Sequence, residues 1–274
     1  MKKLLVLIVT LAALWSGYWF IGAAGVKAGF AAWFDARQSE GWQAEYSDLS
    51  VKGFPNRFDT TLTDPALADP ATGLAWSAPF VQLFALSYQP NHIIAAFPEF
   101  QTLRTPEARF ALKSEKMQAS MVMEPNTDLA FNRANLAATA LTITPEVGAR
   151  IHIAGLQTAL TRENTSSYRA AFNADGLAPP LPAALTGELP EALTSFRADA
   201  TLDFTKPWDI TALEESRPQP TKIKLHLAEA EWGQLKLAAA GELSVDRTGI
   251  PTGTVTIKAR NWRDILALAT ASGA

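Results

Sequence analysis

The chain has 274 residues, no cysteine, and 24 Lys and Arg against 27 Asp and Glu. The lack of cysteine excludes disulfides, a thiol nucleophile and a thiolate metal site. The nearly neutral balance, with no basic stripe, argues against a nucleic-acid partner.

The first segment is apolar and long enough to cross a membrane. Residues 4–25 carry no charge and follow Lys2 and Lys3, and 22 residues match the roughly 20 that a spanning helix needs. A signal peptide with its cleavage site at residues 22–24 is one interpretation. A retained anchor is favoured, because the apolar core is long and aromatic residues gather in its second half. Both interpretations leave the two lysines in the cytoplasm, so we expect a single-pass inner-membrane protein with its bulk in the periplasm.

The helical pattern continues past the apolar segment. Apolar residues recur at spacings of three and four between residues 26 and 39, and Gly41 follows as a left-handed cap. We predict one helix from Lys3 to about Ser39. Its last turns are expected on the membrane surface or against the folded domain, and ordinary packing on a sheet explains them equally well. The expected division is an anchor, residues 1–40, and an exported β-rich domain, residues 41–274. Candidate side chains at the membrane interface are Trp15, Trp19 and Trp33.

After Gly41 the period changes to two, which is typical of strands. Residues 42–51 and 57–63 read as strands around a turn, a hairpin corner being favoured over a binding site. A loop-rich stretch is expected around Pro65, Pro70 and Pro79. The motif in this region consists of Gly41-Trp42, then Gly53-Phe54-Pro55-Asn56-Arg57-Phe58-Asp59, then Leu62-Thr63-Asp64-Pro65.

This motif, placed soon after an apolar N-terminal segment, resembles a bacterial family called domain of unknown function 2125. That family looks related to the AsmA-like envelope proteins. The resemblance implies a curled β-sheet and brings no catalytic residues. It also implies that relatives continue with further strands, so one hypothesis is that this chain is shortened at its C-terminus. The residues that carry the resemblance most specifically are Gly53, Phe54, Pro55 and Arg57.

The second half of the chain alternates regularly between apolar and polar residues. Such alternation indicates antiparallel strands with one buried and one solvated face. Alanines at several inward positions leave room where a closed core would hold larger side chains. The candidates for a lipid-facing groove on the apolar face are Phe196, Leu202, Phe204, Ile223, Leu225, Leu227, Leu235, Leu237, Val255 and Ile257.

Few helical segments are available to cover this apolar face. Only residues 181–193 and 261–270 read as helical in the second half, so the sheet is expected to curl into a groove or to form a sandwich. The family resemblance favours the groove. The predicted fold class is therefore mainly β: an N-terminal helix followed by a long, curled antiparallel sheet with few short helices.

No catalytic signature is present. The histidines at positions 92, 152 and 226 are far apart, and no P-loop, nucleophile elbow or zinc motif occurs. We expect no cofactor, no metal and no enzymatic activity. The favoured hypothesis is a membrane-anchored protein that binds or transfers membrane lipid in envelope biogenesis. The alternative is a non-enzymatic scaffold that contacts other envelope proteins, and an enzyme is the least favoured class.

Overall fold

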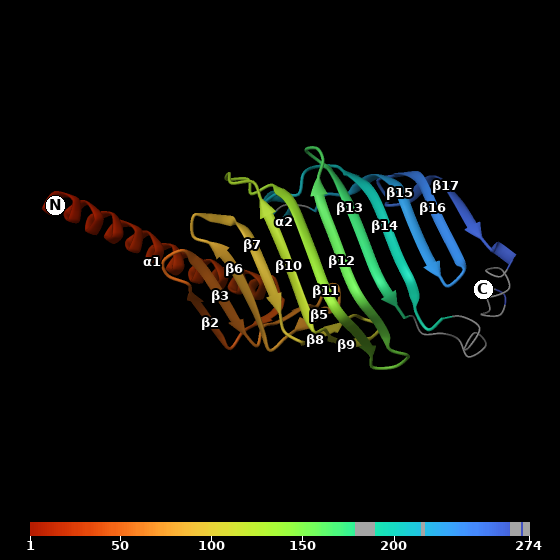
Figure 1. Ribbon diagram of the computed structural model, residues 1–274, viewed down its shortest axis with the longest axis horizontal. Helices are drawn as coiled ribbons and strands as arrows, with labels where there is room; N and C mark the ends of the chain where they lie inside the picture. Colours follow the sequence, from red (N-terminus) through yellow and green to blue (C-terminus); the bar gives the residue numbers. More distant parts are fainter. Residues whose placement is uncertain (179–189, 215–216, 264–269, 271–274) are drawn as a thin grey trace. The chain divides into compact units, whose positions relative to one another are not determined.

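The computed structural model describes residues 1–178, 190–214, 217–263 and 270. The protein is mainly β, with one long helix at its start and few short ones in the described part (Figure 1). The chain divides into two compact units, Met1–Ala111 and Leu112–Ala274. The helix belongs to the first of these units.

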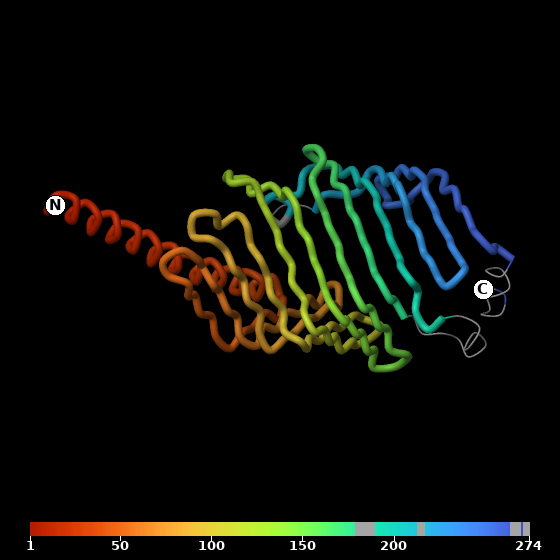
Figure 2. Tube along the Cα trace, viewed as in Figure 1, coloured from red at the N-terminus to blue at the C-terminus, as the bar shows by residue number. Residues whose placement is uncertain are grey.

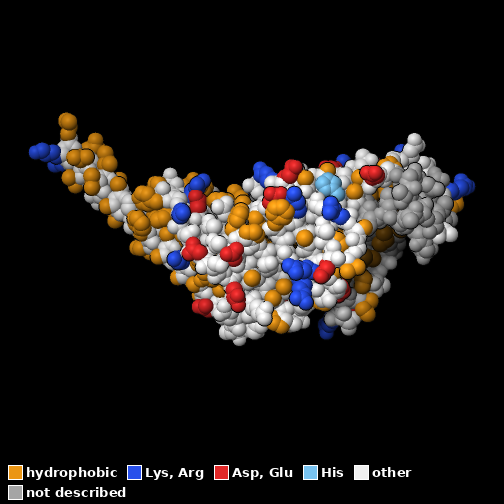
Figure 3. Space-filling view, turned by 90° about the horizontal axis from the view of Figure 1, so that it is seen from below, with side chains coloured by type: hydrophobic (Ala, Val, Ile, Leu, Met, Phe, Trp, Pro, Cys, Tyr) orange, Lys and Arg blue, Asp and Glu red, His pale blue; other side chains and the backbone are white. Residues whose placement is uncertain are grey.

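The first helix, α1 (Lys2–Ser39), confirms the predicted 3.6-residue pattern, and Gly41 has the predicted left-handed conformation with φ +89°. The first part of α1 is exposed and apolar, and basic side chains lie at its N-terminal end (Figure 3). The helix is long and apolar enough to cross a membrane.

The first unit is an antiparallel meander of four long strands. Each is bent into two shorter strands, so that the sheet folds over on itself in two layers. One layer contains β2 (Asp48–Lys52), β3 (Arg57–Thr63), β6 (Phe80–Leu86) and β7 (Gln89–Phe97), paired antiparallel in that order. The other contains β1 (Gln43–Glu45), β4 (Ala66–Asp69), β5 (Leu74–Ser77) and β8 (Phe100–Arg104). A further strand, β9 (Arg109–Lys113), follows.

Bends in the strands connect the two layers. Pro65 and Pro79 follow β3 and precede β6, and a proline cannot donate to a β-ladder. Asp64 adopts φ +47°, and its carboxylate accepts a hydrogen bond from Ser47 Oγ at 2.9 Å. The stretch predicted to be loop-rich is therefore a corner where paired strands change layer, and β4 lies within it.

The last turns of α1 complete the core of this unit. Phe34 is buried with Ala44, Leu49, Leu62 and Val81. Burial of a phenylalanine contributes roughly 1.5–3 kcal/mol, so these turns are integral to the β fold. Of the two positions expected for this part of the helix, the structure shows packing against the folded domain.

The second unit is an eight-stranded antiparallel meander in chain order (Figure 2). Among the described residues β17 pairs with β16 alone, and the sheet is not closed into a barrel. A short helix, α2 (Thr211–Glu214), lies between β14 and β15. The strands are β10 (Lys116–Met123), β11 (Phe131–Pro145), β12 (Ile151–Arg162), β13 (Ser167–Leu177), β14 (Leu193–Phe204), β15 (Pro220–Trp232), β16 (Leu235–Val245) and β17 (Pro251–Arg260).

Two helical predictions fall largely outside the described residues. Most of the segment 181–193 lies there, and its last residue, Leu193, begins β14. Of the segment 261–270, residues 264–269 also lie there, while Trp262 and Arg263 are helical.

Candidate functional site

One face of the second unit's sheet is built from apolar cross-strand rows. Residues that are direct partners in a β-ladder point to the same face, so the register shows which side chains lie together. We call this face the inner face. One row from β13 to β17 consists of Phe172, Ala198, Ala228, Ala239 and Ile257, and the next of Ala170, Ala200, Leu225, Gly241 and Val255.

Most of the predicted apolar set lies on the inner face. The register and the alternation along each strand place nine of the ten candidates there, in agreement with the period-two pattern. They are Phe196, Leu202, Phe204, Ile223, Leu225, Leu235, Leu237, Val255 and Ile257.

Leu227 was placed on the wrong face. The pairing of β14 with β15 shifts by one residue after Leu225, so that Leu227 is opposite Asp199, while Ala228 is opposite Ala198. Such a β-bulge turns every following side chain to the other side. Leu227 therefore lies on the polar face, where it is 37% exposed.

A crossing segment closes one end of the inner face. The hydroxyl of Tyr168 accepts a hydrogen bond from Trp208 N at 2.9 Å, and the carbonyl of Trp208 accepts one from Phe131 N at 2.7 Å. These bonds hold residues 205–214 across the ends of β11, β13 and β14. Tyr168 is almost completely buried beneath them.

A polar group marks the same end. Glu124 Oε1 accepts hydrogen bonds from Asn132 Nδ2, at 3.0 Å, and from the guanidinium of Arg162. Arg162 is the direct partner of Tyr168, so its side chain belongs to the inner face. The apolar rows therefore end at a fixed, half-buried ion pair.

The edge of the inner face that lies on β16 and β17 is open to solvent within the part of the chain that the structure describes. Leu237 and Val255 are exposed to about two fifths, and Ile257 is 63% exposed. Large apolar side chains at such exposure on one continuous face are typical of an interaction surface.

The outer face carries ion pairs. Arg169 binds both carboxylate oxygens of Asp199, at 2.9 and 2.6 Å. The hydrogen bond from Arg169 lowers the pKa of Asp199, against a smaller opposing effect of burial. Lys236 pairs with Glu229 and Glu231 on the same face. This face is therefore suited to water.

The described residues contain no group of three His, Asp or Glu side chains that could hold a metal ion. His152 and His226 each pair with a threonine hydroxyl, at 3.2 and 2.8 Å, as solvated strand residues commonly do.

The first unit brings two predicted groups together. Trp15 Nε1 donates to the carbonyl of Pro55 at 3.0 Å, and Trp19 Nε1 to that of Arg57 at 2.8 Å. Tyr18 donates to the carbonyl of Ser87 at 2.5 Å. Two of the three candidate interface tryptophans, Trp15 and Trp19, therefore bind the turn that carries the family motif.

The three tryptophans differ in their surroundings. Trp19 is only 6% exposed, because its ring packs on Phe54 and Phe58. Trp15 and Trp33 are partly exposed, and the guanidinium of Arg37 lies 5.7 Å from the ring centre of Trp33.

Two glycines allow this close packing. A Cβ at Gly22 would lie 2.6 Å from the ring of Phe58, so only a glycine lets the helix approach that ring. Gly53 has φ +102°, which disfavours other residues at the start of the turn. The segment proposed as a cleavage site thus lies within α1, and Gly22 in it packs against Phe58.

Residues 19–274 match the profile of the bacterial family DUF2125, described as an uncharacterized protein conserved in bacteria. The chain belongs to this family. The match begins at Trp19, so it includes the second half of α1. No curated protein and no solved structure matches the chain.

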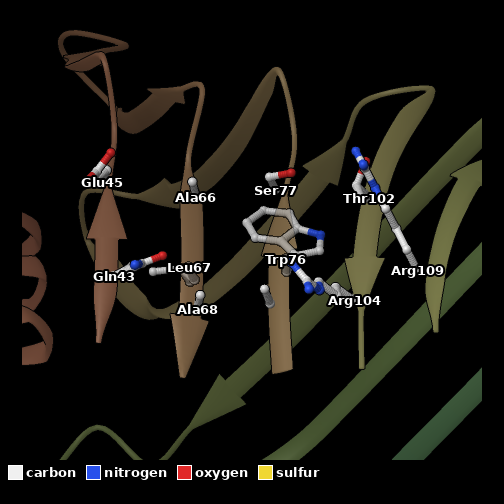
Figure 4. A pocket seen from close by; sticks show the side chains of 11 residues that line it. Gln43, Glu45, Ala66, Leu67, Ala68, Trp76, Ser77, Thr102, Arg104 and Arg109 are labelled. Atoms are coloured by element: carbon white, nitrogen blue, oxygen red, sulfur yellow. The ribbon is translucent and has the colours of Figure 1, made fainter. Parts of the chain in front are cut away.

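The DUF2125 chain also has a shallow trough in its first unit, with polar side chains at its two sides, which sequence reasoning missed. Its volume is about 280 Å³. Gln43 and Glu45 lie on one side, and Arg104 and Arg109 on the other (Figure 4). Register places small side chains of β4 and β5 between them. No sequence signal identifies this site, because its residues come from five strands.

Proposed function

We propose that this protein is a membrane-anchored, periplasmic lipid-binding protein, which holds or transfers phospholipid by its acyl chains on the inner face of the second unit. The observation that carries the proposal is the continuous apolar face with its open side on β16 and β17. The kinship with AsmA-like proteins that the motif suggests remains a prediction.

The small residues of the inner face support this role. Ala198, Ala228 and Ala239 are successive partners in one central row, and in the next row Ala200 and Gly241 lie on either side of Leu225. An acyl chain lying over them would remove apolar surface of both partners from water. At roughly 25 cal/mol per Å², 200 Å² of buried apolar surface would contribute on the order of 5 kcal/mol.

The proposed position in the cell rests on α1. Lys2 and Lys3 precede the apolar stretch, and such residues stay on the cytoplasmic side. The second half of α1 is part of the core of the first unit. A retained helix would therefore hold the β fold close to the periplasmic side of the inner membrane.

The test uses the complete chain in lipid nanodiscs, because α1 contributes to the core. The nanodiscs contain phosphatidylethanolamine with a photoactivatable diazirine in its acyl chain, and labelled peptides are identified by mass spectrometry. We expect labels on inner-face residues of β14–β17. Labelling confined to α1 would contradict the proposal.

Leu225 and Leu227 provide a matched control. They are the same residue type, on the same strand, but lie on opposite faces. We expect Leu225→Gln to reduce labelling of the sheet and Leu227→Gln to leave it unchanged. An Ala200→Trp variant should also block labelling by filling the face, and thermal unfolding of each variant separates lost binding from lost folding.

A second candidate, the envelope scaffold, is favoured by β17. All ten of its residues are exposed, and within the described residues only one of its edges is paired. Such an edge can accept a strand from another protein. Photo-crosslinking from Thr256 in living cells would give a discrete protein adduct under this alternative, and a lipid adduct or none under the favoured one.

A further inference from the structure

We infer that two hairpin turns of the first unit, residues 53–56 and 87–88, enter the membrane interface beside α1, with Phe54 and Tyr88 in contact with lipid. This inference rests on the proposed membrane anchor. It adds a second contact surface to the anchor, and the partner it fits is the bilayer itself.

The first argument is the length of the free helix. The turns are attached to α1 at Trp15, Tyr18 and Trp19. The helix before Trp15 rises only about 20 Å at 1.5 Å per residue, whereas the apolar core of a bilayer is about 30 Å thick. Even a span at the lower limit of about 17 residues, counted from Leu4, ends at Phe20. The membrane therefore reaches the level of both turns.

The second argument is exposure of aromatic side chains at that level. Phe54 is 51% exposed and Tyr88 is 64% exposed. Phe54 also stacks on Phe20 of α1, with ring centres 5.6 Å apart. Aromatic residues at the end of a membrane span are typical of the interface. The turns and the helix thus present one aromatic surface.

The third argument concerns the backbone. In lipid a free carbonyl finds no water, so each must receive a hydrogen bond from the protein. The carbonyls of Pro55, Arg57 and Ser87 accept bonds from the side chains of α1. The amide of Ser87 donates to the carbonyl of Asn56 at 2.9 Å, which joins the two turns.

Charged residues limit the depth. Lys52 and Arg57 flank the first turn and are exposed, and Arg57 pairs with Asp59 at 2.6 Å. Their charges belong at the lipid headgroups, and long basic side chains readily reach that layer. The geometry therefore fits insertion of the turns alone, with the strands above the headgroups.

The experiment uses the absence of cysteine in the chain. Single-cysteine variants Phe54→Cys, Tyr88→Cys and Leu11→Cys receive an environment-sensitive NBD label, and the full chain is placed in phosphatidylethanolamine–phosphatidylglycerol vesicles. Leu74→Cys is the matched control, since Leu74 is also an exposed apolar residue, at 48%, but lies after the turn at the far end of the bent strands. The quenchers are a doxyl-labelled lipid and aqueous iodide.

We expect labels at positions 11, 54 and 88 to show blue-shifted emission, quenching by the doxyl lipid and protection from iodide, and the label at position 74 to show the reverse. Labels at 54 and 88 that behave like the one at 74, with position 11 in lipid, would overturn the inference and leave the anchor standing. Position 11 in water would overturn both. Position 88 is decisive if the Phe54 variant does not fold, because Tyr88 is largely exposed.

Discussion

The indole of Trp19 donates a hydrogen bond to the backbone carbonyl of Arg57, across 2.8 Å. This bond joins two parts of the chain. One is the helix, which is apolar enough to cross a membrane, and the other is the turn that carries the family motif. Gly22 lies against Phe58 one helical turn further on. The apolar helix and the β fold of the first unit are therefore packed together, and both sides of the contact can be tested.

Trp19→Phe should destabilise the first unit. The variant keeps an aromatic ring but removes the N–H group, so the Arg57 carbonyl loses the donor of a partly buried hydrogen bond. An unsatisfied buried polar group costs about 1–3 kcal/mol. Thermal unfolding in mild detergent, followed by circular dichroism, measures the loss. Trp33→Phe is the control, because Trp33 is 42% exposed and its change should have little effect.

Two glycines of α1 should respond in opposite ways to alanine. At Gly22 the new methyl group would lie 2.6 Å from Phe58, whereas at Gly25 no atom lies within 4 Å. Gly22→Ala is expected to cost roughly 1–3 kcal/mol through overpacking. Gly25→Ala is expected to be neutral or to stabilise the helix by up to about 1 kcal/mol. Equal unfolding temperatures for the two variants would mean that the helix does not pack on Phe58.

The N-terminal segment should be retained in the mature protein. Cleavage at residues 22–24 would remove Trp15, Tyr18 and Trp19, and with them the cover of the buried Phe58. Intact mass spectrometry of the protein from bacterial membranes should therefore give the full-length chain. A mass that begins near Gly25 would support the signal-peptide interpretation.

Local periodicity predicted much of the fold. The alternation from Phe196 to Phe204 gave the inner face correctly, since strand side chains alternate strictly until a bulge intervenes. The bulge in β15 had a signal of its own, because Leu227 and Ala228 are adjacent apolar residues, after which Glu229 and Glu231 occupy the former apolar phase. That change of phase indicates a bulge near Leu227, and only the strand register shows that the bulge precedes it.

Contacts between distant segments were not predictable in the same way. Nothing local in the sequence indicates that Trp15 and Trp19 donate to the carbonyls of residues 55 and 57, since this depends on how α1 packs on β3. Pro65 and Pro79 were interpreted as loop signals. In the structure, each lies where a paired strand bends from one layer of the sheet into the other. A proline shows where a ladder must be interrupted, but not whether the strand continues beyond it.

The ion pair on the outer face should make stability depend on acid. The hydrogen bond from Arg169 lowers the pKa of Asp199 in the folded protein, below the value of about 3.9 for an unfolded chain. The unfolded state therefore binds the proton first as the pH falls, so the contribution is complete above about pH 4 and is lost as the pH falls through the folded-state pKa. Asp199→Asn should be less stable than the parent protein at pH 7, and the difference should shrink as the pH falls below about 4. Adding Arg169→Met to this variant should cost little more, because the two side chains act as a pair. Urea unfolding at a series of pH values measures this, and a difference that stays constant from pH 7 to 3 would contradict the pairing.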